Sequence, residues 1–155
     1  MIIEIPKIQP GGSRYAGEDP AEVLELEGES LVRGGDALHY DLVAEIVSGG
    51  VLVRGRVWSA FGLVCGRCAE IFSTTAADSD FIRDYPLRDG QQELDITADL
   101  REAVLLQLPA YPVCSEQCRG LCPRCGRNLN RSPCRCADDP PAGSDAWKAL
   151  DGLKL

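Results

Sequence analysis

Residues 114–136 read CSEQCRGLCPRCGRNLNRSPCRC and carry most of the eight cysteines in this 155-residue chain. Their most distinctive element is the C-P-x-C-G sequence at residues 122–126. Two thiolates two residues apart, Cys122 and Cys125, can bind one tetrahedral ion, and Gly126 lets the turn close. After an eight-residue spacer, Cys134 and Cys136 can supply the other two ligands. Four thiolates leave no open coordination position, so this spacing predicts a structural zinc site and not a catalytic one.

The other four cysteines form two further pairs, Cys65/Cys68 and Cys114/Cys118. Together they predict a second four-thiolate site, which would clamp the C-terminal module onto the preceding chain. The three-residue spacing between Cys114 and Cys118 is looser than that of a zinc knuckle. The sequence therefore predicts at least one zinc ion and leaves open whether there are two, and whether Cys114 or Cys118 serves the first ion. It also leaves iron open, because four cysteines commonly hold iron–sulfur clusters.

Other roles for the cysteines are weaker. Disulfides are disfavoured in a reducing compartment, and isolated buried cysteines, which pack as small hydrophobes, do not explain so dense a cluster. A redox pair with the spacing of Cys65 and Cys68 normally lies at a helix N-terminus, which lowers the thiol pKa. This pair lies between two predicted strands, so we expect no thiol oxidoreductase.

The chain upstream of the module is rich in strand patterns. Residues 1–8 alternate, residues 9–19 are turn-rich and predict a loop, and residues 38–46 and 51–58 alternate around Ser48-Gly-Gly, as in a β-hairpin. Further strands are expected at 61–64, 69–75 and 81–85. His39 points outward in this pattern, so we interpret it as a surface side chain.

Helical spacing replaces alternation after residue 95. Leu100, Val104, Leu105 and Leu108 share one face, and Pro109 ends the helix. We therefore expect an α+β fold: a mostly antiparallel β-sheet or partial barrel, one packed helix and a zinc-stapled C-terminal cysteine-rich module. The expected divisions are a β-rich body at 1–112 with a helix at about 97–108, the module at 113–136, and a linker with a short final helix at 137–155.

Charge separates the module from the body. Residues 114–136 hold five arginines against one acidic residue, a net +4 in a chain of net charge −8, so the remainder carries −12. Arginine suits bidentate contacts to phosphate or carboxylate groups. We interpret this patch as a partner-binding surface, although a solvated surface on a metal loop would look the same. Its members are Arg119, Arg124, Arg127, Arg131 and Arg135.

Several classes of protein are disfavoured. No apolar run approaches the roughly 20 residues of a membrane-spanning helix. The first eight residues lack a signal-peptide pattern, so we expect a cytoplasmic protein. No phosphate-binding loop, nucleophile elbow or carboxylate pair appears, which argues against an enzyme and against a small-molecule substrate.

These residues resemble a known family. The sequence Cys65-Gly-Arg-Cys68 after a hairpin, the helix running into Leu108-Pro, and residues 118–130 with Cys134-Arg-Cys136 are similar to the motifs of the YceD family, over about residue 20 to the end. The resemblance implies a role in accumulation of large-subunit ribosomal RNA and no known enzymatic activity.

From this resemblance we expect a non-enzymatic ribosome-biogenesis factor that binds ribosomal RNA or a large-subunit ribosomal protein. The acidic body suits a basic ribosomal protein better than bare RNA. The alternative is a zinc-ribbon adaptor or regulatory protein that binds a non-ribosomal partner.

Overall fold

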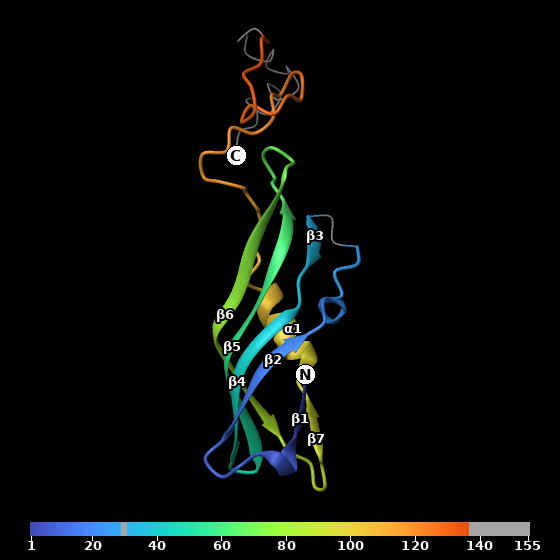
Figure 1. The fold of residues 1–155 in the computed structure, drawn as a ribbon, viewed down its shortest axis with the longest axis vertical. Coiled ribbons are helices and arrows are strands. Elements are labelled where there is room, and N and C mark those ends of the chain that lie inside the picture. Colours follow the sequence, from blue (N-terminus) through green and yellow to red (C-terminus); the bar gives the residue numbers. More distant parts are fainter. Residues whose placement is uncertain (29–30, 137–155) are drawn as a thin grey trace, which may run out of the picture.

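The computed structural model describes residues 1–28 and 31–136. A five-stranded antiparallel sheet, a two-stranded ribbon and one α-helix make up the body, and the helix lies against one face of the open sheet (Figure 1). The strands are β1 (Ile2–Glu4), β2 (Ser13–Asp19), β3 (Val32–Gly35), β4 (Leu38–Val47), β5 (Gly50–Val64), β6 (Ile71–Pro86) and β7 (Glu93–Asp95), and the helix is α1 (Thr97–Leu105). Two 3₁₀ turns, η1 (Ile5–Lys7) and η2 (Ala21–Leu24), complete the order. The expected class, a mostly antiparallel sheet with one packed helix, is confirmed.

Strands β4 and β5 form the hairpin that the alternating pattern predicted. Val47 pairs with Gly50, and the two turn residues, Ser48 and Gly49, both have positive φ. This is the turn geometry that matches the natural twist of a two-stranded ribbon.

The longest element is the β5–β6 hairpin. Strand β6 pairs with β5 along its whole length, while β4 and then β3 pair with the opposite edge of β5. The separate strands expected at 51–58 and 61–64 are one strand, and those at 69–75 and 81–85 are another. Opposite Gly55–Val57 of β5, a bulge places one extra residue in β6, so the buried positions of β6 shift by one between Ala76 and Phe81 while β6 remains one strand.

The expected loop at 9–19 is wrong, because residues 13–19 form β2. This strand pairs with β4 from Ser13 opposite Ala44 to Asp19 opposite Leu38. Turn-forming residues occupy mainly the beginning of the segment 9–19, and cross-strand pairing with β4 overrides the low strand propensity of the rest of the segment. Residues 1–8 are likewise strand only over Ile2–Glu4, with η1 following.

Helix α1 begins as expected and ends earlier than the expected residue 108, at Leu105. The Asp95 side chain accepts a hydrogen bond from the Thr97 backbone N–H at 2.9 Å, which stabilises the first turn. Leu100 and Val104 are fully buried against the sheet, alongside Phe61 and Phe81. The short helix expected near the C-terminus lies outside the described residues.

The buried apolar side chains form two clusters, and the partly buried Phe72 packs against both. The larger joins α1, η2 and the inner face of the sheet, whereas the smaller consists of Cys65, Cys68 and Cys118 with Phe72 and Val113 against them. In the described part of the chain, no helix is long and apolar enough to span a membrane. The body thus has its own core, distinct from the cysteine-rich end.

Candidate metal centres

The tip of the β5–β6 hairpin presents the first cysteine pair. The Cys65 backbone N–H donates to Glu70 O at 2.9 Å, and the Ala69 N–H donates to Cys65 O at 2.9 Å. Ala69 has positive φ, so the chain turns tightly between the strands. Cys65 and Cys68 are 1% and 3% exposed, so both thiols face inward and not into solvent.

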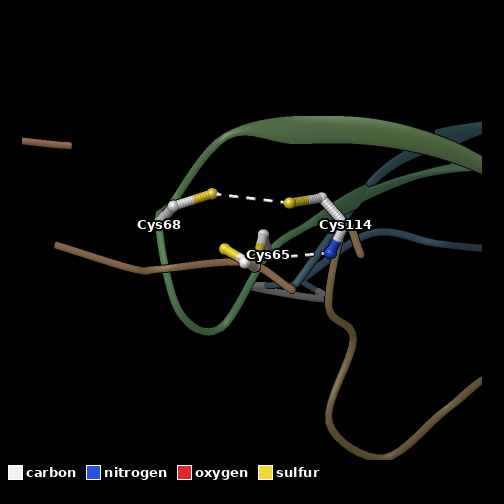
Figure 2. A group of neighbouring side chains, drawn as sticks. Cys65, Cys68 and Cys114 are labelled. Carbon is white, nitrogen blue, oxygen red and sulfur yellow. Dashed lines mark hydrogen bonds between the residues drawn. The ribbon is translucent and has the colours of Figure 1, made fainter. Parts of the chain in front are cut away.

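The chain returns to this tip after α1. The Gly66 N–H donates to Pro112 O at 2.8 Å, and the Cys114 N–H donates to Cys65 Sγ at 3.4 Å. Figure 2 shows Cys65, Cys68 and Cys114 arranged around one small space, with the two chain segments on either side. Residues nearly fifty positions apart in sequence are therefore neighbours.

The first cluster, which we call the inner centre, consists of the sulfur atoms of four cysteines: Cys65, Cys68, Cys114 and Cys118. They lie within 4.8 Å of one another, with Sγ–Sγ distances of 3.9 Å for Cys65–Cys118 and 3.7 Å for Cys68–Cys114. Three of the four are buried.

The second cluster, the outer centre, consists of Cys122, Cys125, Cys134 and Cys136, again within 4.8 Å of one another. Cys122 Sγ and Cys134 Sγ are 3.4 Å apart. The Gly126 N–H donates to Cys122 O at 2.9 Å, and its φ of +69° is the left-handed conformation that the knuckle requires. Only Cys122 is buried, so this centre is the more accessible of the two.

Both centres fit a tetrahedral ion. A zinc–sulfur bond of about 2.3 Å places the sulfur atoms of a tetrahedral site about 3.8 Å apart. The measured separations of 3.4–3.9 Å match this value and are far from a disulfide bond length of about 2.0 Å. The eight cysteines are free thiols, grouped in the two sets of four that the spacing suggested.

Hydrogen bonds bias two of the inner thiols, Cys65 and Cys118, toward the charged form that binds metal. Burial raises the pKa of Cys65, but backbone N–H groups at Cys114 and Cys68 donate to its sulfur, and the pKa falls to about 6. The Asn130 amide, by donating to Cys118 Sγ, lowers the pKa of that thiol. Conversely, the hydrogen bond with Cys118 raises the pKa of Cys114 to about 12.

The outer centre repeats this pattern. Backbone N–H groups at Cys125 and Arg124 lower the pKa of Cys122 to about 6. The hydrogen bond with Cys125 raises the pKa of Cys136 to about 12. Each centre thus holds at least one readily ionised thiol beside a thiol that stays protonated until a cation replaces its proton.

Further hydrogen bonds fasten the cysteine-rich segment to the hairpin tip. The Arg67 guanidinium donates to Glu116 O at 3.0 Å and to Cys118 O at 3.3 Å, while Arg67 O accepts the Leu121 N–H at 3.0 Å. Gly120 has a φ of +74°, and a Cβ there would lie 3.0 Å from Arg67 O. Only glycine allows this close approach between the two segments.

Glu70 provides a second attachment. Its carboxylate accepts the Asn128 side-chain amide at 3.1 Å and pairs with the Arg131 guanidinium at 2.9 Å. Both partners lie in the loop between the two halves of the outer centre. Nothing in the sequence connects these residues with Arg67 or Glu70, because their proximity depends on the hairpin.

The five arginines of the expected binding patch are all exposed. The structure places Arg131 in the ion pair with Glu70, and Arg124 also has an interaction partner. For Arg119, Arg127 and Arg135, no acidic partner lies among the described residues. The free guanidinium groups are therefore fewer than the sequence suggested. The cysteine-rich segment that carries them lies at the hairpin-tip end of the molecule (Figure 1).

Fold and site together define an open antiparallel sheet protein whose longest hairpin is joined to a cysteine-rich segment through two four-thiolate centres. The family described as large ribosomal RNA subunit accumulation protein YceD matches residues 77–154, half of the chain. The chain belongs to this family, as its motifs suggested. The match includes α1 and the six C-terminal cysteines, but not Cys65 or Cys68.

Relatives match larger parts of the chain. An uncharacterized protein of Mycobacterium tuberculosis is 35% identical over 113 residues, which are 64% of this chain and 55% of that protein. One of Mycobacterium leprae is 29% identical over 148 residues, 85% of this chain and 63% of that protein. The large ribosomal RNA subunit accumulation protein YCED homolog 1, chloroplastic, of Arabidopsis thaliana is 38% identical over 45 residues, 29% of this chain and 14% of that protein.

The chain spans about half the length of the Mycobacterium tuberculosis relative that it matches. No solved structure matches it.

Proposed function

We propose that this protein is a non-enzymatic, cytoplasmic factor in ribosome biogenesis that supports the accumulation of large-subunit ribosomal RNA. The support is membership of a family described by that role, together with the name of the Arabidopsis relative. In this proposal the eight cysteines bind two structural zinc ions. Zinc suits closed four-thiolate sites, and it would keep the module ordered without taking part in a reaction.

The observation that carries this proposal is the position of three exposed arginines of the cysteine-rich segment that have no acidic partner among residues 1–28 and 31–136. Arg119, Arg127 and Arg135 are exposed, and ions bound in the two centres would restrict the backbone that carries them. A rigid guanidinium loses less conformational freedom on binding a phosphate or carboxylate group than a guanidinium on a flexible loop.

The partner is large-subunit ribosomal RNA or a large-subunit ribosomal protein in this proposal. The basic segment would contact phosphate or acidic groups, while the body (residues 1–112), with 19 acidic and 9 basic side chains and a net charge of −10, would repel RNA elsewhere and attract a basic protein. Both contacts would be available together in an assembling particle.

Depletion of the protein tests the role directly, with large-subunit ribosomal RNA measured against small-subunit RNA. We expect a selective loss of large-subunit RNA that wild-type protein restores and the Arg119→Glu/Arg127→Glu variant does not. Arg88→Glu is the matched control, because Arg88 is exposed beyond β6, at the end of that strand opposite the cysteine centres.

Unchanged large-subunit RNA after depletion would refute the role. Affinity purification that recovers only non-ribosomal proteins would favour the adaptor alternative.

A further inference from the structure

The side chain of Asn130 belongs to the loop of the outer centre but contacts a cysteine of the inner centre. Asn130 lies between Cys125 and Cys134, both of the outer centre, yet its Nδ2 donates to Cys118 Sγ of the inner centre at 3.3 Å. Its Oδ1 accepts the Arg119 N–H at 2.8 Å. Both polar atoms of the amide are therefore engaged, and this fixes its orientation.

The position of Asn130 depends on the closed loop. Its backbone N–H donates to Asn128 Oδ1 at 2.9 Å, while Asn128 donates in turn to Glu70 on the hairpin at 3.1 Å. The Leu129 N–H donates to Gly120 O at 2.9 Å. Residues 126–133 are tied at both ends by outer-centre cysteines, so an ion there would hold this loop shut.

We propose that Asn130 couples the two centres. An ion in the outer centre closes the loop, the closed loop brings the Asn130 amide to Cys118, and the inner centre then binds its ion more tightly. This inference rests on the metal-binding part of the proposed function and is independent of the ribosomal role. Because coupling between two binding events is reciprocal, an ion in the inner centre strengthens binding at the outer centre by the same factor.

The direction of the effect follows from the charge on a four-thiolate site. Four thiolates around a divalent cation leave a net charge of −2, and an N–H donor to one sulfur spreads part of that charge. Loss of such an outer contact typically lowers metal affinity by about 10–100-fold. Since Cys118 is buried, water replaces the lost donor poorly.

The variant Asn130→Asp isolates this contact. It keeps Oδ1 to accept the Arg119 N–H, but it replaces the donor to Cys118 with a carboxylate oxygen. The zinc affinity of the inner centre would be measured on the full chain by competition with a chromophoric chelator. Cadmium NMR of the cadmium-loaded protein would assign each signal to a centre. We expect about a tenfold or greater loss of affinity and a shift of the inner-centre cadmium signal.

The outer centre is removed separately in the Cys122→Ser/Cys125→Ser variant. We expect it to weaken the inner centre by a similar factor, and the combination with Asn130→Asp to weaken it no further. Arg127→Gln is the control, because this exposed side chain lies in the same loop and makes no contact with a cysteine sulfur in the part of the chain that the structure describes; it should leave the inner centre unchanged.

Asn128→Ala provides a second route, since it removes the acceptor that positions Asn130 without altering a group that touches sulfur. It should also weaken the inner centre. An Asn130→Asp protein with wild-type affinity at the inner centre would overturn the coupling, as would effects of the two variants that multiply. A wild-type chain that binds no metal at all would instead overturn the metal-binding part of the proposed function.

Discussion

Removal of metal should open the cysteine-rich segment and leave the body folded. The segment 113–136 contributes only Cys118 and Cys122 as buried apolar side chains, whereas the core of the body is built from the sheet, η2 and α1. Ordering the backbone costs about 1–2 kcal/mol per residue, and each hydrogen bond returns only about 1 kcal/mol net. Without metal, the hydrogen bonds to the hairpin tip cannot hold 24 residues in place.

The size of the effect can be estimated from the metal sites. A structural zinc site contributes about 10–16 kcal/mol at neutral pH. A change of only about 3 kcal/mol in the free energy of opening raises the open population, and with it the rate of proteolysis, about 100-fold. Trypsin is a suitable probe, because five exposed arginines lie in the segment.

The assay is limited tryptic digestion of the reduced protein with and without a metal chelator, read by mass spectrometry. We expect cleavage within 119–135 to rise at least about 100-fold on chelation, while Arg54 and Arg83, within β5 and β6, stay protected. Equal cleavage rates in the two samples would refute the argument, and so would a body that unfolds together with the segment.

Three further perturbations test separate parts of the structure. Gly55→Ala should destabilise the body by about 2–3 kcal/mol in denaturant unfolding, because the added Cβ would lie 2.2 Å from a β4 carbonyl oxygen. Gly62→Ala in the same strand is the control, since a Cβ there would meet no atom nearer than 3.8 Å. Equal losses of stability in the two variants would contradict the reasoning. Arg119→Glu/Arg127→Glu should weaken binding to large-subunit ribosomal RNA, measured by filter binding at several salt concentrations. The slope of log affinity against log salt concentration should fall by the equivalent of about two phosphate contacts. An unchanged slope would show that these side chains are not at the interface. Acidification should lower the zinc affinity of both centres, because each bound ion must displace the protons of its thiols, and the fall should steepen below about pH 6, where even the lowest-pKa thiols of the metal-free protein, Cys65 and Cys122, become protonated. Competition with a chelator at several pH values measures this affinity, and an affinity that does not change with pH would count against thiolate ligation.

The sequence predicted the local parts of this structure well, because their signals are short-range. Cysteine spacing anticipated the two groups of four, and a Ser-Gly-Gly turn between alternating runs located the β4–β5 hairpin. It missed β2, which pairs with β4 along the edge opposite to β5 and is not part of that hairpin. It also divided β5 and β6 into pieces. In β6 a bulge shifts the buried positions by one between Ala76 and Phe81 without ending the strand, whereas in β5 the buried positions alternate without interruption from Val51 to Leu63.

The contacts around the candidate site were harder to predict, because they join segments that are distant in the chain. Glu70 reads as an ordinary surface acid until the hairpin brings it to Asn128 and Arg131. The five arginines were equivalent in sequence, and only the folded chain separates Arg131, which is paired, from Arg119.

The distribution of charge gives the hairpin a role beyond holding two ligands. Strands β5 and β6 extend well past the end of β4, which pairs only with the first nine residues of β5 as far as Trp58. Cys65 and Cys68 at the tip thus carry the basic segment at one end of an acidic body. Separated charges of this kind orient an approaching partner before contact. The metal centres would then determine where the arginines face, while the core of the body determines whether the chain folds.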